Sequence, residues 1–148
     1  MLKNLNLNMT DFNKIVEIKD DLQLLKELST VDDEIGMIEF VPNDDIFPIP
    51  NGYLKIGNFE MDILAIRKLN AEIVMLDHDS PDCEIGKCAK DLRSFLRAIV
   101  GFINYMQACE KNEDLYDDFK QMEIVAKESA KVAGSNDYLW FYQMMFGI

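Results

Sequence analysis

The chain has 148 residues, a formal net charge of −12, 49% apolar residues and 10% aromatic residues. This length and composition exclude a disordered chain and predict a globule whose core needs neither disulfides nor a structural metal. The negative charge repels nucleic acid and anionic membranes, so we expect neither as a partner, whereas it attracts basic proteins.

The sequence predicts a cytoplasmic protein. No apolar run approaches the roughly 20 residues that a membrane-spanning helix needs. Residues 1–6 lack the basic start, the long apolar core and the small-residue cleavage site of a signal peptide. Three cysteines leave at least one thiol unpaired within the chain, which is typical of a reducing compartment.

The first third of the chain predicts helical structure followed by a strand. Residues 10–28 carry apolar side chains at spacings of three and four, as one helix or two helices would. Residues 37–41 have the composition of a strand. Residues 46–50 contain two prolines and favour an extended edge or a loop, and a tight turn is expected at residues 51–52.

The centre of the chain predicts a β-hairpin. Two apolar runs, residues 63–66 and 73–76, flank a short polar segment, as strands joined by a tight connection do. Residues 53–56 can form a further strand, and we expect Gly57 to permit a backbone turn directly after it. Residues 83–87 can form one more short strand or a loop.

The C-terminal half of the chain predicts helices. Apolar residues share one helical face between residues 89 and 106, and the polar residues 112–114 interrupt the pattern. Gly134 is expected to end a further helix, and a last, aromatic helix runs to Phe146. No repeat, low-complexity segment or linker interrupts the chain, so we expect residues 1–148 to form a single α+β domain.

Several short motifs between residues 37 and 102 resemble those of the SUKH superfamily. In chain order they are a strand, the acidic turn Asp44-Asp45-Ile46, Tyr-Leu-Lys-Ile-Gly-Asn at 53–58, Asp62, a strand, Val-Met-Leu-Asp-His-Asp at 74–79, and a helix containing Ser94-Phe95-Leu96. The aromatic segment 136–140 resembles the C-terminal helix of several members. Glu60 and Met61 stand where the family usually has glycines, so we expect a differently shaped loop there.

The resemblance implies a twisted antiparallel sheet packed by helices, with a helical segment at residues 103–148, and a protein that works by binding. The superfamily contains the yeast regulators of cell-wall glucan synthesis, which act as interaction hubs. It also contains many bacterial immunity proteins that block secreted toxins, often nucleases or deaminases. On this reading Gly57, Asp62, Asp77 and His78 are determinants of the fold.

Asp77, His78 and Asp79 are the constellation with catalytic residue types. His78 can serve as a general base, or as one of three metal ligands together with the two carboxylates. In a strand, however, side chains alternate, so His78 would point away from both neighbours. Because His78 is the only histidine, no second imidazole can complete a usual transition-metal site. We therefore expect structural or capping roles here, and neither an enzyme nor a bound metal or cofactor.

Other signatures of chemistry are weak. Cys83 and Cys88 are separated by four residues, which is not the two-residue spacing of a zinc knuckle or redox pair, and Cys109 ends a helical stretch. The chain has no glycine-rich nucleotide-binding loop and no nucleophile elbow of a hydrolase.

Carboxylates and aromatic residues are the candidates for a partner-binding surface. Carboxylates can take the place of nucleic-acid phosphates on the basic surface of a nuclease, and exposed aromatic residues anchor interfaces. The same aromatic residues fit a core position equally well. The candidate set is Asp32, Asp33, Glu34, Asp44, Asp45, Tyr53, Phe59 and Glu60. A second concentration of acidic residues lies between residues 110 and 118.

The leading hypothesis is a non-enzymatic immunity protein that neutralises a basic protein toxin by occlusion, with nucleases as one class of target. One alternative is a regulatory adaptor similar to the glucan-synthesis regulators. The other is an enzyme that uses Asp77, His78 and Asp79.

Overall fold

The computed structural model describes residues 9–31, 34–41 and 48–148. Five strands form one antiparallel sheet in which each strand pairs with its neighbours along the chain. The strands are β1 (Ile38–Glu39), β2 (Tyr53–Phe59), β3 (Asp62–Arg67), β4 (Ile73–Leu76) and β5 (Glu84–Ala89). The helices are α1 (Met9–Val16), α2 (Asp21–Leu28), α3 (Leu92–Lys111), α4 (Phe119–Ala133) and α5 (Leu139–Phe146), with short 3₁₀ helices η1 (Glu113–Asp117) and η2 (Asn136–Tyr138). The α+β fold expected from the sequence is confirmed.

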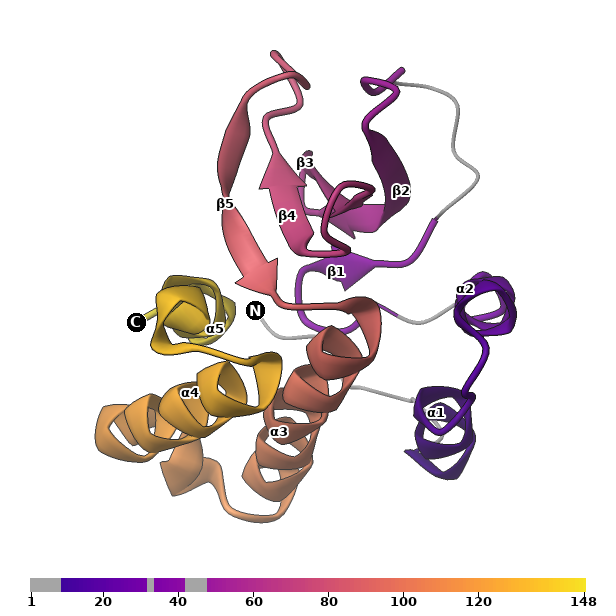
Figure 1. The fold of residues 1–148 in the computed structure, drawn as a ribbon. Helices are drawn as coiled ribbons and strands as arrows, with labels where there is room; N and C mark the ends of the chain where they lie inside the picture. The colour runs from indigo at the N-terminus through magenta and orange to yellow at the C-terminus, as the bar shows by residue number, and fades with distance from the viewer. Residues whose placement is uncertain (1–8, 32–33, 42–47) are drawn as a thin grey trace.

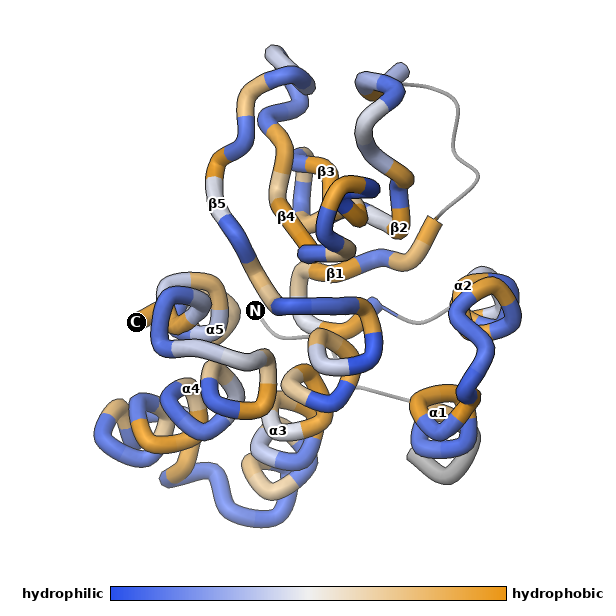
Figure 2. Tube along the Cα trace, viewed as in Figure 1, coloured by the Kyte–Doolittle hydropathy of each residue, from blue (hydrophilic) through white to orange (hydrophobic). Residues whose placement is uncertain are grey.

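The helices gather on one side of the sheet. In Figure 1, α3, α4 and α5 lie together beneath the sheet, and α1 and α2 lie to the side of α3. Figure 2 shows that hydrophobic residues are concentrated in β3 and β4, in the middle of the sheet. Among the described residues, no helix combines the length and the apolar character needed to cross a membrane.

The main core lies between the sheet and the helices and is organised around Phe141 of α5. The Phe141 ring contacts the ring of Phe59 at a centroid distance of 5.3 Å and that of Phe95 in α3 at 5.6 Å. Phe59 is only 4% exposed. Of the two roles that the sequence left open for Phe59, an exposed anchor or a core residue, the structure has the core residue.

The two central strands are buried on both faces. Ile73 and Met75 of β4 belong to the main core, whereas Val74 and Leu76 belong to a second cluster on the opposite face. The complete second cluster, called here the outer-face cluster, consists of Ile63, Ala65, Val74 and Leu76. Burial on both faces explains why β3 and β4 have continuous apolar runs instead of an alternating pattern.

Hydrogen-bonding side chains and a glycine set the helix ends. Asp20 accepts a hydrogen bond from the Leu22 amide, so residues 10–28 form two separate helices. Asp91 accepts one from the Ser94 amide at 2.8 Å and starts α3. Gly134 ends α4 with a φ of 125°, as the sequence predicted.

Gly57 lies inside β2, so the expectation of a turn at this residue is wrong. The chain turns instead at Glu60 and Met61, between the paired residues Phe59 and Asp62, and Glu60 has a φ of 52°. That left-handed conformation favours glycine. Gly57 is required for another reason: a side chain there would overlap the backbone carbonyl oxygen of Glu39 in β1.

The remaining expectations for the strands are met with changed boundaries. The predicted hairpin forms with Ile63 opposite Leu76 and Ile66 opposite Ile73. The predicted strand at residues 37–41 is reduced to the two residues of β1, and residues 83–87 form a strand, β5. The expected tight turn at residues 51–52 is present.

Replacing Gly57 with alanine should lower the free energy of unfolding by about 1–3 kcal/mol, because the new Cβ forces β1 and β2 apart. Urea unfolding measures the change. Gly52→Ala is the matched control, because a Cβ at Gly52 meets no atom within 4 Å, and we expect a change below about 0.5 kcal/mol. Equal stabilities of the two variants would contradict the proposed close approach of β1.

Candidate functional site

Acidic residues meet at the end of the sheet where β3 begins and β4 ends. Asp62 is the first residue of β3, and Asp77 follows directly after β4. Because Ile63 pairs with Leu76, the antiparallel register places Asp62 next to the residues that follow β4. We call Asp62, Asp77, His78 and Asp79 the Asp–His cluster.

His78 is at the centre of the Asp–His cluster. Its ring Nδ1 lies 2.9 Å from Oδ1 of Asp62, and its backbone amide donates a hydrogen bond to the same oxygen at 3.2 Å. Nδ1 also lies 4.0 Å from Oδ1 of Asp77, and Nε2 lies 3.4 Å from Oδ1 of Asp79. The Asp79 amide donates to Asp77 at 2.8 Å, which closes a local turn.

This geometry corrects the expectation that His78 points away from its neighbours. β4 ends at Leu76, so the three residues after it form a turn and their side chains do not alternate. Sequence reasoning also assigned Asp62 to the fold motif without placing it beside His78. The sequence did contain a signal for this contact. If the apolar runs 63–66 and 73–76 pair along their whole length, Asp62, just before the first run, lies opposite Asp77 and next to His78, just after the second.

The carboxylates give the cluster a strongly negative environment. The hydrogen bond that Asp62 accepts from the ring, with the charges of Asp79 and Asp77, raises the pKa of His78 above its ordinary value. Within the part of the chain that the structure describes, no lysine or arginine forms an ion pair with these carboxylates. Asp79 is 84% exposed, whereas the Asp62 and His78 side chains are about one third exposed or less. The cluster is therefore suited to attract a cation from solution.

Asp62, Asp77 and His78 also have a possible metal-binding arrangement. Each offers one ligand atom, and these atoms lie within 4.8 Å of one another; no other such group of three occurs among the described residues. The cysteines are not part of it. Cys83 is exposed, Cys88 and Cys109 are buried, and burial raises the pKa of both buried thiols.

A second polar group covers the outer-face cluster. The Arg67 guanidinium makes a two-pronged contact with Glu84, with Nε donating to Oε1 at 2.8 Å, and it also donates to Glu72 at 2.9 Å. Tyr53 donates its hydroxyl proton to Glu84 at 2.6 Å. Arg67 lies two residues after Ala65 in β3, so its side chain lies on the outer face of the sheet.

This polar group bears on the role of Tyr53, for which the sequence left open an exposed anchor or a core position. Its ring packs against the outer-face cluster and its hydroxyl is engaged by Glu84. Both the packing and the hydrogen bond give Tyr53 a structural role. The contact between Arg67 and Glu84 joins residues 17 positions apart on different strands, and no sequence pattern indicates it.

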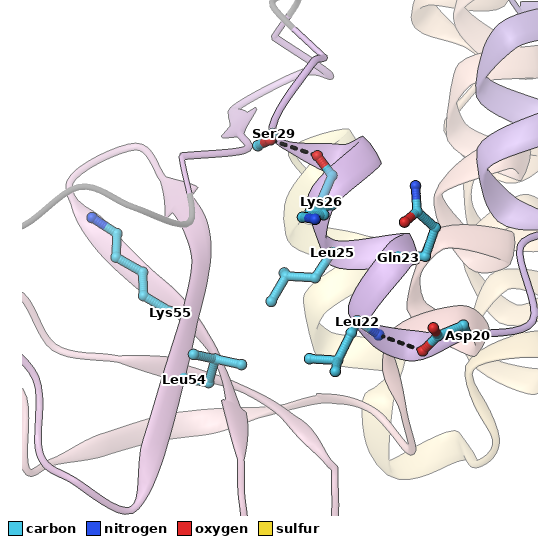
Figure 3. A pocket seen from close by; sticks show the side chains of 8 residues that line it. All are labelled: Asp20, Leu22, Gln23, Leu25, Lys26, Ser29, Leu54 and Lys55. Carbon is cyan, nitrogen blue, oxygen red and sulfur yellow. Dashed lines mark hydrogen bonds between the residues drawn. The ribbon is translucent and has the colours of Figure 1, made fainter.

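A pocket of about 440 Å³ lies between α2 and β2. In Figure 3, Leu22 and Leu25 extend from α2 toward Leu54 of β2. Leu22 is 75% exposed and Leu54 is 40% exposed. The lining residues are Asp20, Leu22, Gln23, Leu25, Lys26, Ser29, Leu54 and Lys55. Sequence reasoning did not find this pocket, because its two walls come from separate elements.

The other predicted partner-binding residues fall into three groups. Glu34 and Glu60 are exposed. Asp32, Asp33, Asp44 and Asp45 lie outside the described residues. The second acidic concentration is exposed at the end of α3, in η1 and just before α4, and it includes Glu110, Glu113, Asp114, Asp117 and Asp118. Tyr116 and Phe119 are exposed beside it, at 40% and 61%.

Comparisons with known proteins gave no match: no family model, no curated protein and no solved structure is similar to this chain. The sequence motifs and the geometry described above therefore carry the functional argument.

The Asp62 contact should be visible in the titration of His78. We expect the His78 pKa, measured by NMR of the ring protons, to lie above its ordinary value of about 6.5. Asp62→Asn should lower the pKa, because the largest stabilising contact of the charged ring is removed. Asp82→Asn, on the same connection but outside the cluster, should leave it nearly unchanged. Equal pKa values in the two variants would contradict the assigned cause.

The contact between Arg67 and Glu84 should stabilise the fold in a pH-dependent manner. Arg67 lowers the pKa of Glu84 in the folded state. The Glu84 carboxylate therefore stabilises the fold fully at pH values above the pKa of Glu84 in the unfolded chain, about 4.3. This stabilisation is lost as the pH falls through the lowered pKa of Glu84 in the folded state. Glu84→Gln should lower the free energy of unfolding by about 1–3 kcal/mol at pH 7.

Urea unfolding at pH 7 and pH 3 tests this dependence. The difference between the original protein and Glu84→Gln should shrink at the lower pH. Glu128→Gln, at an exposed position of α4, is the control and should change stability little at either pH. A Glu84→Gln effect that stays constant between the two pH values would show that the charge is not responsible.

Proposed function

We propose that this chain is a non-enzymatic protein-binding domain of the SUKH type, an immunity protein that neutralises a basic protein toxin by occlusion. The observation that carries the proposal is the acidic end of the sheet. We define this surface by Glu60, Met61, the Asp–His cluster and Asp82. The SUKH-like motifs of residues 37–102 and the antiparallel sheet packed by helices support the same proposal.

The acidic end has the composition of a protein interface. Met61 is 70% exposed at the β2–β3 turn, and exposed carboxylates of Glu60, Asp79 and Asp82 lie on the segments around it. An apolar side chain within a charged rim is the usual anatomy of a contact with another protein. The carboxylates select for a partner with lysine and arginine side chains.

The rigidity of this surface favours it over the acidic segment at η1. The turn at Glu60 is closed by paired strands, and the Asp62–His78 contact ties it to the segment after β4. A preformed surface loses less side-chain and loop entropy when it binds. At η1, by contrast, acidic side chains lie on a five-residue 3₁₀ helix that contributes no buried residue.

The mechanism would combine charge attraction and steric exclusion. The net charge of −12 accelerates the encounter with a basic toxin. Once bound, the immunity protein covers the toxin surface that would otherwise contact the anionic substrate of the toxin. Long-range attraction of this kind is screened by salt over about 8 Å at physiological ionic strength. No catalytic residue is required in this mechanism.

Co-expression with the toxin encoded by the neighbouring gene tests the proposal. We expect protection of growth, a complex in pull-down, and an association rate that falls at least about tenfold between low and physiological salt. Toxicity that persists without a complex would refute it. Capture of a housekeeping protein instead of the toxin would favour a regulatory adaptor.

Two double variants with the same change of net charge locate the interface. Glu60→Lys with Asp79→Lys should weaken toxin binding at least about a hundredfold, because each reversal places like charges in contact. Asp114→Lys with Asp117→Lys at η1 should reduce only the association rate, by a few-fold. The opposite ranking would place the interface at η1.

A further inference from the structure

We propose that the Asp–His cluster binds a divalent first-row transition cation, with Asp62, Asp77 and His78 as its protein ligands. This metal site does not require the proposed toxin partner to exist, because it is inferred only from contacts within the chain. It also departs from the expectation, drawn from the sequence, that no metal binds here.

The spacing of the ligand atoms fits the coordination sphere of such a cation. Bonds of about 2.1 Å place neighbouring ligand atoms about 3.0 Å apart at right angles and about 3.4 Å apart in a tetrahedron. Nδ1 of His78 lies 2.9 Å from Asp62 and 4.0 Å from Asp77, on either side of these values. Shifts of about 1 Å in the Asp77 carboxylate would complete the geometry.

The backbone already holds two of the three ligands in place. The His78 amide donates to Asp62, which ties the segment after β4 to the first residue of β3. Asp77 accepts from the Asp79 amide, and the Asp77 amide donates to the carbonyl oxygen of Cys83 at 3.0 Å. A metal site formed by such restrained groups loses little entropy on binding.

The charge of the cluster favours the binding of a cation. The carboxylates of Asp62, Asp77 and Asp79 converge on one imidazole, each with an oxygen within 4.0 Å of a ring nitrogen. A cation would bind the lone pair of Nδ1, and the neutral ring would carry its single proton on Nε2. Asp62 then exchanges a hydrogen bond for a metal bond.

The imidazole ligand determines which class of cation fits. Ca²⁺ prefers six to eight oxygen ligands, more than this cluster supplies, and Mg²⁺ also prefers oxygen. Neutral imidazole together with carboxylates suits Zn²⁺ and its neighbours in the first transition row. The exposed Asp79 leaves one side of the cluster open, so water can occupy the remaining coordination positions.

Equilibrium dialysis and calorimetry with Zn²⁺ alone and Ca²⁺ alone test the site. All proteins should carry Cys83→Ser, because Cys83 is an exposed thiol close to the cluster in sequence and would bind zinc by itself. We expect one Zn²⁺ per chain, bound at least tenfold more tightly than Ca²⁺. Asp77→Asn and His78→Gln should each weaken Zn²⁺ binding at least about tenfold.

Asp82→Asn is the matched control, since it removes the same charge from the same connection without removing a ligand. It should change the Zn²⁺ affinity less than about twofold. Circular dichroism of each variant, with NMR of the His78 ring during Zn²⁺ addition to the Cys83→Ser protein, separates ligand loss from unfolding. The His78 ring signals should shift in parallel with binding.

Three results would overturn the proposal. The first is the absence of Zn²⁺ binding below millimolar concentration. The second is equal weakening by Asp77→Asn and Asp82→Asn, which would indicate a diffuse acidic surface. The third is saturation with Zn²⁺ that leaves the His78 ring signals unshifted.

Discussion

The antiparallel pairing of β3 with β4 is the constraint on which the rest of the structure depends. Both strands are buried on both faces, so a shift of one residue would move side chains of the main core to the outer face and those of the outer-face cluster to the helix side, where neither set fits the existing packing. The register is therefore strongly specified. It also fixes the ends of the hairpin, and so brings Asp62 against His78 at one end of the sheet and Arg67 against Glu72 at the other.

The aromatic C-terminal helix protects the edge of this sheet. Trp140 donates its indole proton to the carbonyl oxygen of Lys87, and Tyr142 donates its hydroxyl proton to that of Cys88, each at 2.8 Å. Unpaired carbonyl groups on an edge strand invite pairing with another chain. The same contact makes Gly86 necessary, because a side chain there would overlap the Trp140 ring. The helical layer thus blocks part of β5, while the acidic end of the sheet remains open.

The sequence predicted those elements whose signals are local. Apolar runs indicated the hairpin, helical periodicity indicated α3, and Gly134 marked the end of α4 because its conformation there is left-handed. Prediction from the sequence failed where a contact joins segments that are distant along the chain. The role of Gly57 depends on the approach of β1, and the orientation of His78 depends on where β4 ends. The acidic candidates were recognised, but their grouping required the strand register.

The Asp–His cluster has two possible cationic partners, and they need the same groups. A lysine or arginine side chain of a protein partner would approach the carboxylates that are most exposed, above all Asp79. A transition cation would lie deeper, between Asp62, Asp77 and the His78 ring, and would neutralise the charge that attracts the protein. The negative charge of the cluster attracts both the metal cation and the cationic side chains of the protein partner, and these two positive charges repel each other when both are bound. Binding of the metal therefore lowers the affinity for the protein partner, and the reverse also holds. The two proposed functions of this end of the sheet are therefore coupled through its charge.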